Sequence, residues 1–197
     1  MKRSALLALA WAAATSAAAQ GGSYAERFAS VCAACHGAQG VSTQALTPTL
    51  AGQPSFYAIT QLFLFRDGRR DNAVMSAVAK GMSDDDLRGF SEAIAALPAP
   101  PPPAPPADAQ RFERGAALAQ RLHCTGCHGA DLSGGKQVPR LAGQREDYLL
   151  HTLQGFRAAT RVGYGPAMTE ALAGTTPQQL EDLAHHLAHA GAAATRP

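Results

Sequence analysis

The sequence contains the pentad Cys-x-x-Cys-His twice, at residues 32–36 and 124–128, and these two copies account for all four cysteines. The pattern is typical of the covalent attachment of c-type haem. If each pentad begins on a helix, its two cysteines share a face, and each thiol can form a thioether with one haem vinyl group. The histidine that follows can then bind the iron from one side. The residues predicted to bind two covalently attached haem c groups are Cys32, Cys35, His36, Cys124, Cys127 and His128.

Two other chemistries also use paired cysteines, and the sequence disfavours both. In a zinc ribbon the two Cys-x-x-Cys pairs lie close together along the chain, whereas here they are 92 residues apart. Disulfides would suit an exported protein, but they would leave the histidine at the end of each pentad unexplained. Haem attachment accounts for all of these residues.

The rest of the sequence repeats with the pentads. Pro48–Gln53 returns 91 residues later as Pro139–Gln144, with proline, leucine, alanine, glycine and glutamine kept in place. Further pairs keep the same offset: Tyr57 with Tyr148, Phe65 with Phe156, and Arg66 with Arg157. The repeat predicts two homologous units of about 80 to 90 residues, in which the cofactor supplies the apolar centre that so small a unit lacks.

Four segments follow from this repeat. Residues 1–19 are typical of a secretory signal, because two basic residues precede a short apolar run and then three alanines. The run is short for a membrane span, although an uncleaved anchor is the alternative. We place the first unit at residues 20–97 and the second at residues 108–197. Residues 98–107 between them are rich in proline and predict a stiff spacer, the alternative being a ligand for an SH3-type domain.

The predicted location is the periplasm, because haem is attached to paired thiols outside the reducing cytosol. The formal charge of +2 equals the charge of Lys2 and Arg3, which leave with the signal, so the mature chain is nearly neutral. A nucleic-acid partner would need a basic face, and none is predicted.

The hydrophobic pattern predicts helices joined by long loops, with no strand. Each unit should open with a helix that runs into its pentad, continue with a middle helix and end with a capped helix. Ser83 is followed by three aspartates, and Thr176 by Pro177 and two glutamines, so both residues are predicted N-caps of the last helices. The other predicted helices span about 24–34, 54–66, 109–127 and 145–158.

One methionine in each unit is a candidate for the sixth iron ligand. Met75 and Met168 both lie eight residues before the predicted cap of the last helix, in what we expect to be a loop over the far side of the haem. Met82 has no counterpart, since Thr175 stands at the matching position, so it is the alternative ligand in the first unit only. A methionine in a helical protein also commonly fills the core.

The order of pentad, Pro-x-Leu-Ala-Gly-Gln loop, Phe-Arg, methionine and capped helix resembles class I cytochrome c. Two such units after a signal resemble the dihaem cytochrome c4 family, over almost the whole mature chain. The resemblance implies an all-α fold of two tandem class I cytochrome c domains. It further implies that the carbonyl groups of Pro48 and Pro139 accept hydrogen bonds from His36 and His128, which fixes the orientation of each imidazole.

The resemblance also implies that the two haems face each other through their propionates, with Arg66, Arg157, Tyr57 and Tyr148 as candidates to bind them or to fill core or solvated positions. Members of this family usually carry an aromatic residue in the last helix. Here Ala93 and His186 stand at the expected positions, so the sequence leaves open how these helices pack.

Three other histidines cluster near the end of the second unit. His185 and His189 have the i, i+4 spacing of a metal site, but exposed residues at a helix end are the commoner case, and His186 lies beside them. His123 is expected to be exposed and His151 to be structural. If any of these residues displaced Met168, the second haem would have two histidine ligands and a lower potential.

Histidine and methionine together fill both axial positions of an iron and favour the ferrous state. The sequence therefore predicts a one-electron carrier and not an enzyme. The expected partners are redox proteins, with a quinol-oxidising complex or a periplasmic dehydrogenase as donor and a terminal oxidase or reductase as acceptor. Peripheral membrane association stays open. The alternative is a dihaem enzyme, peroxidase-like or thiosulfate-oxidising, with one open or labile haem ligand.

Overall fold

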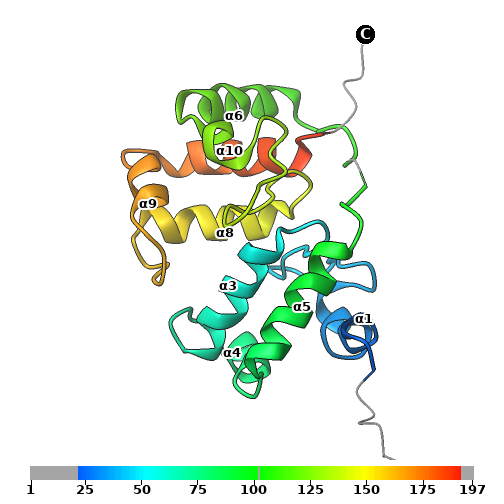
Figure 1. The fold of residues 1–197 in the computed structure, drawn as a ribbon. Coiled ribbons are helices and arrows are strands. Elements are labelled where there is room, and N and C mark those ends of the chain that lie inside the picture. The colour runs from blue at the N-terminus through cyan, green and yellow to red at the C-terminus, as the bar shows by residue number, and fades with distance from the viewer. Residues whose placement is uncertain (1–21, 102, 192–197) are drawn as a thin grey trace, which may run out of the picture.

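The computed structural model describes residues 22–101 and 103–191, so the signal predicted at residues 1–19 lies outside the described residues. Within these ranges the regular elements are all helices, apart from an isolated antiparallel bridge between Gly135 and Val138. This agrees with the predicted all-α fold. The helices form two groups, which we call the first unit (α1 to α5) and the second unit (α6 to α10), and the two groups lie one above the other (Figure 1).

The first unit begins with three helical segments that follow one another without a break, so the first pentad ends a helical run that starts at Tyr24. The middle segment is π-helical and therefore wound more widely than its neighbours. The elements are α1 (Tyr24–Arg27), η1 (Phe28–Cys32), α2 (Ala33–His36), α3 (Ser55–Arg66), α4 (Ala73–Ala79) and α5 (Asp84–Ala96).

The second unit differs at its pentad, where the predicted continuous helix is wrong. The opening helix ends at Arg121, and His123 adopts the left-handed conformation with φ of 54°. A new short helix then starts at Cys124, because the chain cannot continue a right-handed helix through that residue. The elements are α6 (Ala109–Arg121), α7 (Cys124–His128), α8 (Glu146–Arg157), α9 (Ala167–Ala171) and α10 (Pro177–His189).

Both predicted caps of the last helices are confirmed. The side chain of Ser83 accepts from the backbone N–H of Asp86, and that of Thr176 accepts from the backbone N–H of Gln179. In each case the side chain at the third helical position accepts a hydrogen bond from the backbone N–H of the cap residue, which completes a capping box. The N–H and hydroxyl of Ser83, together with the guanidinium of Arg27 2.6 Å away, hold the pKa of Asp86 well below its usual range. Asp86 therefore joins α1 to α5 as well as capping α5.

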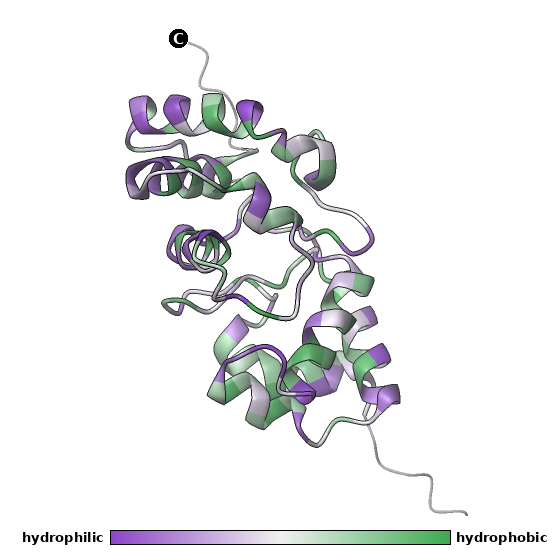
Figure 2. Ribbon diagram, turned by 90° about the vertical axis from the view of Figure 1, so that its left-hand side faces the viewer, coloured by the Kyte–Doolittle hydropathy of each residue, from purple (hydrophilic) through white to green (hydrophobic). Residues whose placement is uncertain are grey.

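The two units bury different amounts of apolar side chain. The second unit has one cluster of thirteen buried residues, centred on Leu172, Leu180, Leu183 and Leu187. The first unit has two small clusters of three buried residues each, one around Phe28 and one around Phe90. Hydrophobic and hydrophilic residues are mixed along the helices of both units (Figure 2). The helices α5, α6 and α10 each have an apolar face that is buried in their own unit.

The first and last helices of each unit cross at a glycine. This crossing explains how the last helices pack although Ala93 and His186 stand where an aromatic residue was expected. In the second unit the glycine is Gly115 on α6, and His186 on α10 packs there with its ring 4.7 Å from that of Phe112. In the first unit the arrangement is reversed. Gly89 lies on the last helix, and Tyr24 from the first helix covers it. The crossing therefore keeps a ring over a glycine without an aromatic residue at Ala93.

Replacing Gly115 with alanine is expected to lower the free energy of unfolding of the second unit by about 1–3 kcal/mol, the usual cost of overpacking a well-packed contact. A β-carbon there would lie 2.1 Å from the backbone oxygen of Asp182, which cannot move away without displacing α10. Thermal unfolding followed by circular dichroism measures the loss. Gly165→Ala is the matched control, because a β-carbon at Gly165 meets no atom within 4 Å. Equal melting temperatures for the two variants would contradict the prediction.

The proline-rich linker does more than separate the units. Ala99 covers Gly52 in the first unit, and Pro100 covers Gly143, the equivalent residue of the second unit, with the nearest approach to a β-carbon at 3.0 and 3.2 Å respectively. The linker thus begins by crossing the contact between the two repeated loops. In the part of the chain that the structure describes, no helix is long and apolar enough to span a membrane.

Candidate haem sites

The two pentads present their side chains in the same way. His36 and His128 are buried, each with 6% of its surface exposed, whereas Cys35 and Cys127 are exposed. The first cysteine of each pentad, Cys32 or Cys124, is half-buried. Because a helical turn separates the two cysteines, both thiols can reach one ligand lying against the pentad.

Each histidine ring is held by a proline carbonyl group of its own unit. His36 Nδ1 lies 2.9 Å from the oxygen of Pro48, and His128 Nδ1 lies 2.9 Å from the oxygen of Pro139. With the carbonyl as acceptor, Nδ1 must carry the proton, which leaves Nε2 as the free lone pair of each ring. This is the pairing that the resemblance implied, and the two distances are the same in both units.

Burial sets the protonation of the side chains in both pentads. Burial lowers the pKa of His36 and His128, although the bond to the proline carbonyl raises it in part, so both rings are neutral and able to bind iron at pH 7. Burial also raises the pKa of the Cys32 thiol to about 11, and that of Cys124 in the same direction. At pH 7 these two cysteines are therefore neutral thiols before any cofactor binds.

The candidate methionines lie on short helices and not in loops, which corrects the prediction. Met75 is on α4 and Met168 is on α9. Both are half-buried, and each packs against the same apolar cluster as the first cysteine of its own unit. In the first unit this cluster is Leu62, Leu87 and Phe90, and Met82 also contacts it. In each unit the first cysteine of the pentad and the candidate methionine therefore contact the same apolar cluster.

Sequence profiles of two families match the chain. The family described as Cytochrome c matches residues 112–191, and that described as Cytochrome C oxidase, cbb3-type, subunit III matches residues 19–92. Cytochrome c4 of Thiocapsa roseopersicina is 33% identical over 168 residues, which are 80% of this chain and 85% of that protein. The chain belongs to the cytochrome c4 family.

Further comparisons agree with this assignment. The crystal structure of reduced recombinant cytochrome c4 from Pseudomonas stutzeri superimposes with a TM-score of 0.75 at 29% identity, covering 85% of this chain and 96% of that one. The thiosulfate dehydrogenase electron acceptor of Stutzerimonas stutzeri is 36% identical over 72% of this chain and 69% of its own length. As a member of the cytochrome c4 family, the chain carries covalently bound haem c in two cytochrome c domains and transfers electrons.

Two of the four candidate propionate ligands have another role in this cytochrome. Arg66 donates to the backbone oxygen of Met82 at 3.1 Å, and Arg157 donates to that of Thr175 at 3.2 Å. Met82 and Thr175 are equivalent residues that directly precede the caps of the last helices. Both arginines therefore fasten the middle helix of a unit to the start of its last helix.

A second pair of arginines lies where the units meet, and the sequence reasoning missed it. Arg70 donates to the hydroxyl of Tyr148 at 2.9 Å and to Gln61, which also accepts from the hydroxyl of Tyr164. Arg161, the equivalent of Arg70, donates to Tyr164 at 3.3 Å. The signal was present in the sequence, because these two arginines keep the 91-residue offset of the repeat.

One unpaired donor in this cluster indicates that the cluster could bind haem propionates. The Nε–H of Arg161 is buried with no hydrogen-bond partner in the chain, so a carboxylate would satisfy it. Burial raises the pKa of Tyr57, whereas Arg70 and Arg161 lower the pKa of Tyr148 against its burial. The positive side of the cluster therefore lies at Tyr148, and Arg70, Arg161 and the tyrosines are the residues that would hold the propionates.

The histidines of the second unit form a structural group. The candidate ligand atoms of Glu146, His185 and His189 lie within 4.8 Å of one another, which is the arrangement of the metal alternative. Both oxygens of Glu146 are already paired, one with Arg111 at 2.9 Å and the other with His185 Nδ1 at 2.8 Å. The positive charge of Arg111 on this carboxylate disfavours the binding of a metal ion there. The ion pair and the hydrogen bond of Glu146 instead connect α6, α8 and α10.

Two expectations for the other histidines were wrong. His185 is buried, with 5% of its surface exposed, and not at an exposed helix end. His151 is exposed on α8 and does not belong to the buried residues of that helix. His123 is exposed, as predicted.

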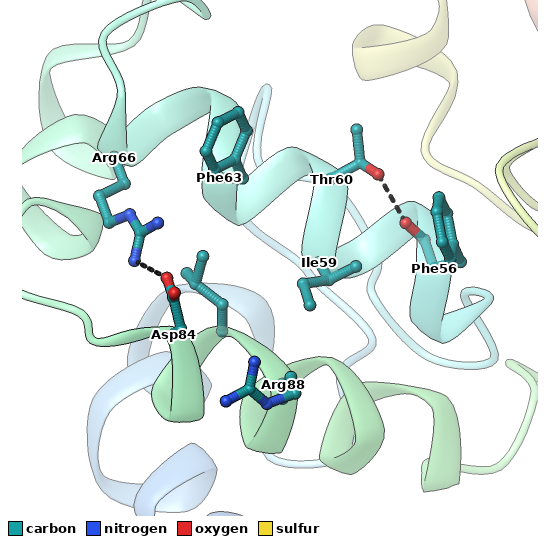
Figure 3. Close-up of a pocket in the computed structure, with 8 residues that line it drawn as sticks. Phe56, Ile59, Thr60, Phe63, Arg66, Asp84 and Arg88 are labelled. Atoms are coloured by element: carbon teal, nitrogen blue, oxygen red, sulfur yellow. Dashed lines mark hydrogen bonds and ion pairs between the residues drawn. The ribbon is translucent and has the colours of Figure 1, made fainter.

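A shallow groove between α3 and α5 borders the first candidate site, because Leu87 lines the groove and also belongs to the apolar cluster that Cys32 and Met75 contact. Phe56, Ile59 and Phe63 line it from α3, and the ion pair between Arg66 and Asp84, at 2.8 Å, closes one end (Figure 3). None of the candidate iron ligands lines this groove. The groove therefore adjoins the first candidate haem site but contains none of its predicted iron ligands.

Proposed function

We propose that this cytochrome is a periplasmic one-electron carrier with two closed iron sites, His36 with Met75 in the domain at residues 20–97, and His128 with Met168 in the domain at residues 108–197. The observation that carries the proposal is the matched geometry of the two units. In each, one buried neutral histidine is fixed by a proline carbonyl group, and one methionine shares an apolar wall with the pentad.

The haem group supplies the one-electron couple when it is bound. The chain determines the orientation of the histidine and the access of water to the site. The proline carbonyl group holds the Nδ1 proton of each histidine, so the imidazole keeps one orientation and one tautomer. The apolar wall excludes water, which favours the less charged ferrous form. With both axial positions held by the protein, the site changes little in shape when an electron is gained or lost.

The visible spectrum of the exported protein tests this function. We expect two covalent haems per chain, low-spin bands in both oxidation states, a methionine-to-ferric charge-transfer band, and no change on addition of carbon monoxide. Binding of carbon monoxide to either haem would show an open iron, and the dihaem-enzyme alternative would then replace the carrier. The composition already weakens a thiosulfate-oxidising enzyme with an extra cysteine ligand, because both pentads together use all four cysteines.

For the electron donor we propose a periplasmic dehydrogenase rather than a quinol-oxidising complex, with a terminal oxidase or reductase as acceptor. The support is the relative named as a thiosulfate dehydrogenase electron acceptor, which is 36% identical to this chain. Stopped-flow mixing of the oxidised cytochrome with a thiosulfate dehydrogenase and thiosulfate should reduce both haems within seconds. Reduction only by a quinol-oxidising complex would assign the donor to that class instead.

A further inference from the structure

Two buried glutamines, one from each repeated loop, make a reciprocal contact between the units. Gln144 of the second unit accepts from the backbone N–H of Thr49 at 2.8 Å and donates to the backbone oxygen of Thr49 at 2.8 Å. Gln53 of the first unit does the same to Arg140, at 3.0 and 2.9 Å. The two glutamines are equivalent in the repeat, and so are Thr49 and Arg140. The contact therefore has approximate two-fold symmetry within a single chain.

Each of these contacts falls on the peptide group that holds a haem histidine. The N–H of Thr49 and the carbonyl group of Pro48 belong to the same peptide unit, and that carbonyl group accepts from His36 Nδ1 at 2.9 Å. In a trans peptide the C=O and N–H point in opposite directions. One side of the peptide therefore faces the histidine of its own unit, and the other side faces the glutamine of the opposite unit.

The same path exists in the other direction. Gln53 binds the N–H of Arg140, whose peptide unit contains the carbonyl group of Pro139, the acceptor for His128. Gln144 and Thr49 are at most 6% exposed, so water does not compete for the bonds between them, whereas Arg140 is half-buried and its bonds with Gln53 are partly buried. An amide that donates at its N–H becomes a better acceptor at its C=O, because hydrogen bonds in a chain polarise one another.

We propose that Gln144 and Gln53 are positioning residues that act across the domain boundary, each strengthening the hydrogen bond on the haem histidine of the opposite unit. The inference rests on the proposed ligation of iron by His36 and His128. A stronger bond at Nδ1 increases the negative character of the imidazole, which stabilises ferric iron and lowers the reduction potential. Each unit thus lowers the reduction potential of the haem in the other unit. The contact between the units is therefore one of the factors that determine both potentials.

The test is to replace each glutamine with leucine, which keeps its approximate size but removes both hydrogen bonds. We expect Gln144→Leu to raise the potential of the first-unit haem and leave that of the second unchanged, and Gln53→Leu to do the reverse. The expected change in each reduction equilibrium is about threefold, on the order of 30 mV for one electron. Redox titration followed by nuclear magnetic resonance resolves the two haems, which are assigned through their covalent links to Cys32 and Cys35 in the first unit and to Cys124 and Cys127 in the second.

The control is Gln61→Leu, which also removes hydrogen bonds from a buried glutamine between the units. Its partners are Arg70 and Tyr164 of the arginine–tyrosine cluster and not a peptide linked to a histidine, so any shift that it causes acts through that cluster. We expect this variant to lack the crossed pattern. If the leucine variants do not fold, Gln144→Asn and Gln53→Asn shorten the side chain and keep it polar, and the same crossed pattern should appear with smaller shifts.

Unchanged potentials, or equal shifts of both haems in every variant, would overturn the proposal, since equal shifts are the result of separating the units. These outcomes are distinct from a failure of the proposed function. Wild-type spectra without low-spin, histidine-ligated haem c would remove the ligation itself, whereas normal wild-type spectra with uncrossed shifts would remove only the action of the glutamines.

Discussion

Replacing Met168 with alanine is expected to give a second-unit haem that binds carbon monoxide and has a much lower reduction potential. The drop should be on the order of 100–300 mV, within the range of about 0.8 V over which axial ligands move haem potentials. Met168 lies on α9 and contacts the apolar cluster that Cys124 also contacts. Alanine cannot reach an iron there. Spectroelectrochemistry with and without carbon monoxide measures both effects.

The equivalent change in the first unit, Met75→Ala, should affect only the first haem, and Met82→Ala is its control. Met75 and Met82 contact the same cluster, but Met82 has no equivalent in the second unit. Its backbone oxygen, moreover, accepts from Arg66. A charge-transfer band that survives Met75→Ala and disappears in Met82→Ala would move the ligand to Met82.

Replacing Cys32 and Cys35 with serine is expected to reduce the covalent haem from two groups per chain to one and to unfold much of the first unit. We expect the first unit to depend more on its cofactor, because its clustered buried residues form two groups of three and not one continuous core. The same change at Cys124 and Cys127 should remove the other haem but leave more helix intact, since the second unit buries a cluster of thirteen residues.

A haem stain after denaturing electrophoresis and mass spectrometry count the attached groups, and circular dichroism measures the remaining helix. We expect the helical signal to fall further in the first double variant than in the second. An equal loss in both would show that the cofactor contributes similarly to each unit, in spite of the difference in buried side chains.

Much of the fold followed from the sequence because the decisive signals are local. The caps at Ser83 and Thr176 depend on residues within one helical turn, and the structure has both. The break before Cys124 was missed because His123 takes a left-handed conformation that no glycine or proline announces. The methionine helices were missed because α4 and α9 have only seven and five residues.

The parts of the sites that depend on both units could not be predicted in the same way. The side chains of Arg66 and Arg157 turn toward a backbone oxygen in their own unit, whereas those of Arg70 and Arg161 lie between the units. Both pairs keep the repeat, so spacing alone could not separate them. What distinguishes them is the docking of the units, which follows from contacts between residues about 80 to 100 positions apart.

The two-fold contact between the repeated loops has a consequence for the way such a chain can arise. A surface that pairs with its own copy can join two separate single-domain molecules, provided that they are concentrated enough. Covalent linkage removes that requirement, because a short linker holds the second surface at an effective concentration in the millimolar range. Here the linker passes directly over Gly52 and Gly143 in the two loops. The chain therefore holds in one polypeptide the contact that two separate subunits would make as a dimer. Either half can then change its sequence while the linker keeps it beside the other half.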